Sequence, residues 1–148
     1  MKTLRESIEI DVSPEIIWDW LLDLAENYLE WHHSHIKANW ETEKASKIGS
    51  ILYAEEDISG DFLKMRSKLT ELIPNSLYRF KTVGGLKIIL AGGSFEIEPS
   101  KNGSVFTATL DFRMGNLLSK IAKKKVKKIS QHMMEEGENL KKILEKSE

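Results

Sequence analysis

The sequence of 148 residues contains no cysteine. This absence excludes disulfides, thiolate nucleophiles and every cysteine-based metal site, and it suits a reducing compartment. No apolar run approaches the roughly 18 residues that a membrane-spanning helix needs. The N-terminal residues 1–6 also lack the apolar stretch of a signal peptide. We therefore expect a cytoplasmic protein without a membrane span.

An excess of charge of one sign is missing as well. The net charge is -1 and the pI is about 6.4, so no overall field attracts nucleic acid or an anionic membrane. The lysine-rich run 123–128 is balanced by acidic residues further along and indicates the solvated face of a helix. Neither a dinucleotide fingerprint nor a serine-hydrolase elbow motif is present. We expect no nucleic-acid partner.

The pattern of apolar residues and turns predicts a single α+β domain over residues 1–148. Residues 3–11 alternate as a strand, and Ser13-Pro14-Glu15 begins a helix that runs to about residue 25. A second short helical segment covers 27–33, and residues 116 to about 144 form a long final helix. Between them, short turns separate six expected strands at 36–44, 50–58, 62–72, 77–83, 86–98 and 104–114. The Gly92-Gly93 pair predicts a β-bulge.

This order of elements, with the segment Ile10-Asp11-Val12-Ser13-Pro14-Glu15-Ile16-Ile17-Trp18, resembles the helix-grip fold of the START and Bet v 1-like (SRPBCC) superfamily. That superfamily includes the polyketide cyclase-like proteins. The resemblance implies a curved antiparallel sheet of six or seven strands around the long C-terminal helix. It also implies a cavity for a small hydrophobic or aromatic ligand, but no particular reaction.

Three polar stretches are not required by a plain apolar cavity. Three of the four histidines lie within residues 32–35. On the strand 50–58, alternation places Glu56 on the same face as apolar neighbours, so we expect it to point inward. In the last helix His132 and Glu136 are spaced i, i+4 beside an apolar stripe. Two imidazoles and two carboxylates are typical of a zinc or other divalent-metal site.

The same stretches resemble the diacetylphloroglucinol hydrolases, zinc-dependent carbon–carbon hydrolases built on a helix-grip domain. That family has a Tyr-x-x-Trp-His-Pro-x-x-His segment, whose start is matched by Tyr28, Trp31 and His32, and whose terminal histidine is matched by His35 if one residue is deleted. The family's strand glutamate is matched by Glu56, and its His-x-x-x-Glu pair on the last helix is matched by His132 and Glu136. The resemblance implies that His35, Glu56, His132 and Glu136 hold the metal and that Tyr28 orients an aromatic or polyketide-like ketone for hydrolysis.

Structural explanations stand beside these interpretations. The histidine cluster is also compatible with a polar surface turn, and His132 with Glu136 is compatible with an exposed helical pair. Glu55 and His32 stay open as alternatives to Glu56 and His35. The sequence thus leaves three functions: a metal-dependent hydrolase, a metal-free binding or transport protein for a small hydrophobic ligand, and a protein-interaction module. It does not indicate the ligand or the oligomeric state.

Overall fold

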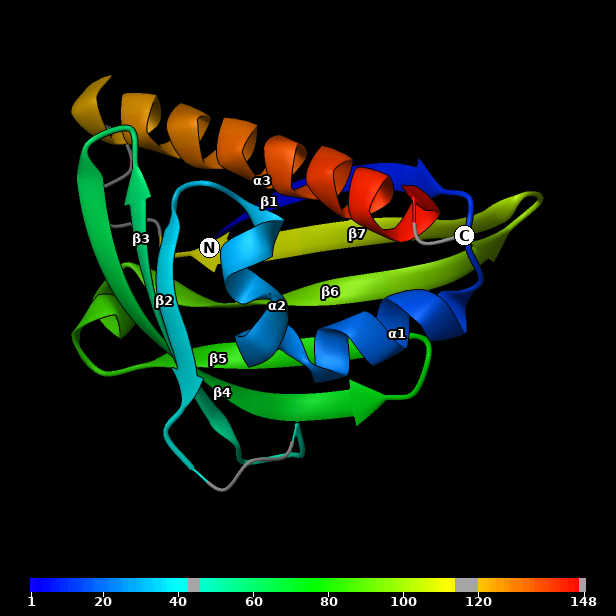
Figure 1. Cartoon of the computed structure of the whole chain (residues 1–148). Coiled ribbons are helices and arrows are strands. Elements are labelled where there is room, and N and C mark those ends of the chain that lie inside the picture. The colour runs from blue at the N-terminus through cyan, green and yellow to red at the C-terminus, as the bar shows by residue number, and fades with distance from the viewer. Residues whose placement is uncertain (43–45, 114–119, 147–148) are drawn as a thin grey trace.

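The computed structural model describes residues 1–42, 46–113 and 120–146. Its strands form a curved antiparallel sheet in the order β1-β7-β6-β5-β4-β3-β2 (Figure 1). The strands are β1 (Lys2–Ile10), β2 (His35–Trp40), β3 (Ile51–Ile58), β4 (Asp61–Ile73), β5 (Leu77–Val83), β6 (Leu90–Ser100) and β7 (Gly103–Phe112). Helices α1 (Pro14–Leu22) and α2 (Leu24–Trp31) carry the chain from one sheet edge to the other. The long helix α3 (Lys120–Lys146) lies across the curved sheet. The expected helix-grip architecture is confirmed.

The two short helices meet earlier than the sequence pattern predicts. Pro14 begins α1 after Ser13, whose backbone is extended with φ -68° and ψ 155°, as expected for a proline start. The second helix begins at Leu24 rather than at residue 27. The side-chain amide of Asn27 donates a hydrogen bond to the carbonyl of Trp20 at 2.9 Å. That bond satisfies a carbonyl at the end of α1 and fixes the angle between the helices.

The predicted strand 86–98 is wrong at its start. Residues Gly85–Ile88 form a 3₁₀ helix, η1, and β6 begins at Leu90. The expected bulge is confirmed, because the pairing of β6 with β7 shifts register between Leu90 and Gly92. A Cβ atom at Gly92 would lie 2.4 Å from the backbone oxygen of Phe80. Glycine therefore permits the close approach of β5 and β6 that bends the sheet.

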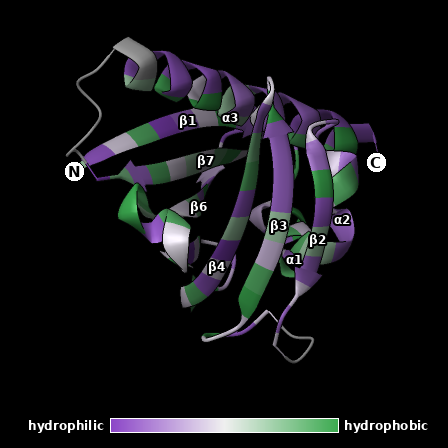
Figure 2. Ribbon diagram, turned by 90° about the vertical axis from the view of Figure 1, so that its left-hand side faces the viewer, coloured by the Kyte–Doolittle hydropathy of each residue, from purple (hydrophilic) through white to green (hydrophobic). Residues whose placement is uncertain are grey.

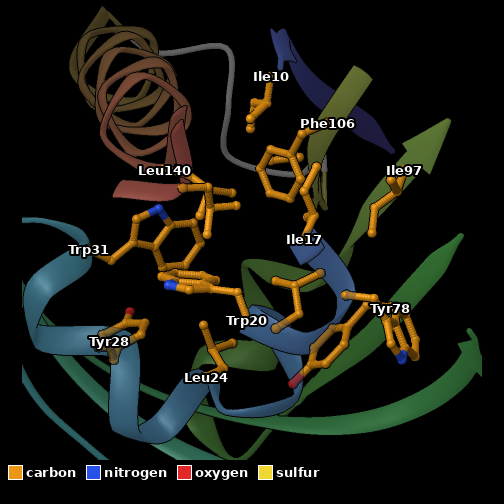
Figure 3. Packing of buried hydrophobic residues seen from close by; sticks show 14 of the residues in the cluster. Ile10, Ile17, Trp20, Leu24, Tyr28, Trp31, Tyr78, Ile97, Phe106 and Leu140 are labelled. Atoms are coloured by element: carbon orange, nitrogen blue, oxygen red, sulfur yellow. The ribbon is translucent and has the colours of Figure 1, made fainter. Parts of the chain in front are cut away.

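The core lies between the sheet and the helices. Hydrophobic and hydrophilic residues alternate along the strands (Figure 2), which turns one face of the sheet toward α3. The Trp31 ring of α2 lies beside Leu140 of α3, and its centroid is 5.0 Å from that of Trp20 in α1 (Figure 3). The predicted apolar stripe of α3 is buried at Met133, Gly137, Leu140 and Leu144. The predicted helix residues 116–119 lie outside the described residues.

Candidate metal centre

All four predicted metal ligands converge on the inner side of the sheet. His35 is the first residue of β2, and its partner in the antiparallel register is Glu56 of β3. His132 and Glu136 face them from one side of α3. The exposed fractions of His35, Glu56 and His132 are 5%, 4% and 5%, and the side chain of Glu136 is 13% exposed. The surface-turn interpretation of the histidine cluster therefore does not hold for His35, and His132 and Glu136 are not an exposed pair.

A β-bulge turns His35 inward. Ala38 and Trp40 of β2 are half-buried, whereas Ile36 and Lys37 are both exposed. Simple alternation from Ala38 would point Ile36 inward and His35 outward. The pairing of β2 with β3 shifts register between His35 and Lys37. The extra residue at this bulge moves the side chain that precedes it, His35, to the other face of the sheet. The bulge thus brings the imidazole of His35 against Glu56.

The donor atoms of the four side chains lie close enough together to surround one ion. The Nε2 atom of His35 lies 2.8 Å from Oε2 of Glu136, 3.1 Å from Oε1 of Glu56 and 3.3 Å from Nε2 of His132. The Nε2 atom of His132 lies 3.2 Å from Oε2 of Glu136 and 3.8 Å from Oε1 of Glu56. Bonds of about 2.0–2.2 Å to a tetrahedral zinc ion would separate its ligand atoms by roughly 3.3–3.6 Å, so the closest pairs would have to move apart by up to about half an ångström. The residue types and their grouping fit a divalent metal.

The hydrogen bonds of the imidazoles distinguish His35 from His32. The Nδ1 atom of His35 lies 2.7 Å from the backbone oxygen of Tyr28, an acceptor only, so Nδ1 carries the hydrogen. In a neutral His35 the Nε2 lone pair therefore faces the cluster. His32 is the opposite case: its Nδ1 accepts from the backbone N–H of Ser34 at 2.9 Å, and its Nε2 lies 2.8 Å from a carboxylate oxygen of Glu135. Neutral His32 has no free lone pair for a metal.

Supporting contacts hold the cluster in place. The Tyr28 hydroxyl donates to Oε1 of Glu56, and the Tyr28 ring stacks on His35 with centroids 3.9 Å apart. The Trp31 indole N–H donates to the backbone oxygen of Glu136 at 2.9 Å. In return, the Asn139 side-chain amide donates to the Trp31 carbonyl at 2.9 Å. The sequence prediction missed Asn139, because no spacing pattern ties it to a residue 108 positions away.

The second candidate carboxylate lies elsewhere. Glu55 follows the opposite alternation from Glu56 on β3 and is only half-buried. Its carboxylate accepts a hydrogen bond from the hydroxyl of Tyr53, on the same outer face. Glu55 therefore does not join the cluster, and Glu56 does.

The buried charges balance one another without an ion. Burial, the largest influence, lowers the pKa of both cluster histidines, but hydrogen bonds to Glu136 and Glu56 outweigh it. The pKa of His35 rises to about 9 and that of His132 to about 10. Burial also opposes ionisation of Glu56, yet hydrogen bonds to His132 and His35 lower its pKa below its usual range. For Tyr28, burial and then the Glu56 charge raise the pKa well above its ordinary value. Two imidazolium ions can thus neutralise the two carboxylates of the cluster, as one divalent metal ion would.

The cluster closes one end of an apolar cavity of about 370 Å³. Tyr28, Glu56, His132 and Glu136 form its polar end. The remaining walls are mostly apolar and come from the sheet, α2, η1 and α3, including Trp31, Leu52, Met65, Leu69, Phe80, Phe95, Leu110 and Ile129. A pocket of this size and lining suits a small apolar ligand. No helix in the described ranges has the length and apolarity that a membrane crossing requires.

Fold and cavity together define a helix-grip ligand-binding protein. A family model described as polyketide cyclase/dehydrase and lipid transport matches residues 1–145, and the chain belongs to this family. The polyketide cyclase-like resemblance expected from the sequence is confirmed. A search of curated proteins finds no match.

Solved structures show the same fold at low sequence identity. TTHA0849 from Thermus thermophilus is 13% identical, with a TM-score of 0.80 over 99% of each chain. MLL2253 from Mesorhizobium loti is 14% identical, with a TM-score of 0.74 over 99% of each chain. The di-domain ARO/CYC protein StfQ of the steffimycin biosynthetic pathway is 13% identical, with a TM-score of 0.75. This chain is covered to 98% and spans about half (51%) of StfQ.

Proposed function

We propose that the protein is a metal-dependent hydrolase of an apolar ketone, aromatic or polyketide-like, and that His35, Glu56, His132 and Glu136 hold zinc or another divalent metal. The observation that carries the proposal is the convergence of two imidazoles and two carboxylates from β2, β3 and α3 at the end of an apolar cavity. The local resemblance to the diacetylphloroglucinol hydrolases involves the same four residues.

Crowding around His35 favours a metal over a simple ion cluster. Its Nε2 atom has three polar atoms within 3.3 Å, yet a protonated Nε2 has one hydrogen to direct at one of them. One of the three is the Nε2 atom of His132, which in an imidazolium is itself a donor. A dication between the donors attracts all four groups at once. The Nδ1–H bond of His35 to a carbonyl is the arrangement that orients histidine ligands of metals.

The chain's own residues supply the other requirements of such a reaction. A divalent metal held by His35, Glu56, His132 and Glu136 would supply a Lewis acid for a carbonyl and would lower the pKa of a bound water. The Tyr28 hydroxyl lines the cavity beside Glu56, so it can turn from that carboxylate to hydrogen-bond a substrate oxygen. The apolar walls hold the substrate body and exclude bulk water, which strengthens every electrostatic interaction at the cluster.

The metal-free binding protein is the second candidate, and one observation favours it. The two histidines and two glutamates already pair with one another at 2.8–3.2 Å and balance in charge. In that case the cluster is a structural ion network at the end of the cavity, and the cavity carries a ligand without chemistry.

Elemental analysis of protein purified without a histidine tag separates the two candidates. The hydrolase proposal predicts about one metal ion per chain after zinc is added and excess removed. His132→Ala is expected to lose it, while His33→Ala, which changes an exposed histidine next to the site, is expected to keep it. A folded protein that takes up no zinc would refute the metal site.

The reaction is tested separately with an acylphenol as the model ketone. The zinc-loaded protein is expected to release the free acid, and chelator or His132→Ala is expected to abolish that release. Turnover that is the same with and without metal would contradict the proposed mechanism. Metal uptake without any hydrolysis of aryl ketones would support the proposed metal site and refute the proposed hydrolase activity.

A further inference from the structure

The end of the cavity away from the cluster is lined by cations. Arg113, which follows β7, and Lys125 of α3 both line the cavity and are both exposed. The carboxylates among the described lining residues are Glu56 and Glu136, and both belong to the cluster. The cavity is therefore polarised, with its acids at one end and its bases at the other.

Apolar side chains border the same opening. Ile88 of η1 is 72% exposed and the adjacent Ile89 is 49% exposed, and both line the cavity. Large apolar side chains left in water beside a pocket are typical of a site that a ligand covers. An exposed cation next to them selects the charge of the group that lies there.

The guanidinium of Arg113 is oriented for this role. Its Nε–H donates to the backbone oxygen of Lys87 at 2.9 Å, which anchors the side chain to η1. Within the described ranges the terminal N–H groups of the guanidinium have no further hydrogen bond, so they can form a fork for an anion. The structure gives no ion pair to Arg113 or to Lys125 among its described residues.

The spacing along α3 sets the length of the ligand. Lys125 and His132 are seven residues apart on one helix, which is roughly 10 Å at about 1.5 Å per residue. A chain of about ten carbons, or two to three fused rings, spans such a distance. The other polar side chains among the described lining residues, Ser67, Tyr78 and Thr109, are uncharged.

We infer that the ligand is an amphipathic anion whose apolar body fills the cavity and whose carboxylate or phosphate lies at the mouth against Arg113 and Lys125. The inference rests on the proposed function for the group that reaches the cluster, and on the cavity alone for the anion at the mouth. It names a substrate class for that site: a ketone with an acidic group about 10 Å from the reacting carbon.

The test compares decanoate, decyl phosphate and 1-decanol by isothermal titration calorimetry, with protein as purified and after chelator treatment. Either anion is expected to bind roughly three- to tenfold more tightly than the alcohol, as one or two partly exposed charge pairs allow. Arg113→Gln with Lys125→Gln is expected to remove the preference. Lys123→Gln, an exposed lysine on the same helix that does not line the cavity, is expected to keep it. Decanoate and decyl phosphate then show which anion the mouth prefers.

Two outcomes overturn the inference: no preference for the anions in the unchanged protein, and a preference that survives in the double variant. If His132→Ala removes the surviving preference, the anion lies at the cluster instead. Because the preference is measured after chelation too, it is independent of metal uptake. An absence of metal would therefore refute the proposed hydrolase activity but would not affect the inference about the anion at the mouth.

Discussion

Zinc binding at this cluster is expected to release about two protons near neutral pH. In the metal-free protein, hydrogen bonds to Glu136 and Glu56 outweigh the effect of burial and raise the pKa of His35 to about 9 and that of His132 to about 10. Both imidazoles are therefore charged at about pH 7.5, and both must lose a proton before Nε2 can bind a metal. The carboxylate of Glu56, with its lowered pKa, contributes no proton.

Isothermal titration calorimetry in two buffers of different ionisation enthalpy measures this number directly. The difference in observed enthalpy gives the protons released per zinc ion, and the expected value is about two. The release is expected to fall toward zero as the pH is raised above about 10, where the metal-free imidazoles are already neutral. His33→Ala should give the same result, since His33 is exposed and outside the cluster.

Tight zinc binding with almost no proton release at about pH 7.5 would refute this reasoning. It would mean that both imidazoles are already neutral before the metal binds. Release of about one proton from a variant that keeps only one of the two histidines would support assigning one proton to each.

Three further predictions concern stability. The charged histidines of the cluster stabilise the metal-free protein fully below pH 6.5, and this stabilisation is lost as the pH rises through about 9 and about 10. The ionised carboxylate of Glu56, whose pKa is lowered, stabilises the protein above pH 4.5, and this stabilisation is lost as the pH falls. Melting temperatures should therefore peak between these limits, and zinc should remove the alkaline loss. Tyr28→Phe removes a hydrogen bond to a buried carboxylate and should lower the unfolding free energy in urea by about 1.5–3 kcal/mol; no change would exclude that bond. Gly92→Ala, whose Cβ would meet the Phe80 backbone oxygen at 2.4 Å, should cost about 1–3 kcal/mol or more, whereas Gly85→Ala, with open space, should cost far less.

Features carried by local chemistry could be predicted from the sequence. Proline after serine began α1 at Pro14, because a fixed φ and a missing N–H suit the first helical residue. The inward position of Glu56 followed from its apolar neighbours Ala54 and Ile58, both buried with it on β3. Strand alternation is a property of a few adjacent residues, so the inward face of β3 could be predicted without knowing its partner strand.

Apolar composition alone did not separate η1 from β6. Residues 86–90 contain four large apolar side chains and no alternation, a run that fits a buried strand and a short helix equally well. Gly84, with φ 82°, turns the chain at a backbone angle that few other residues adopt. The 3₁₀ turn then places its isoleucines at the mouth of the cavity. Only the packing of this corner against β5 and β6 decides between the two conformations.

The choice between His35 and His32 depends on contacts that no local pattern contains. Regular alternation along β2 would have pointed His35 outward, and a bulge near Ile36, set by the pairing with β3, reverses it. The backbone oxygen of Tyr28 then fixes the hydrogen of His35 on Nδ1, whereas the backbone N–H of Ser34 fixes that of His32 on Nε2. Two buried histidines with the same intrinsic chemistry thus differ in their partners: His35 directs Nε2 at the cluster, and His32 directs Nε2 at Glu135. The bulge turns the imidazole of His35 toward Glu56, and the backbone around each histidine selects which nitrogen carries the hydrogen. The cluster therefore arises from strand pairing rather than from the run of histidines itself.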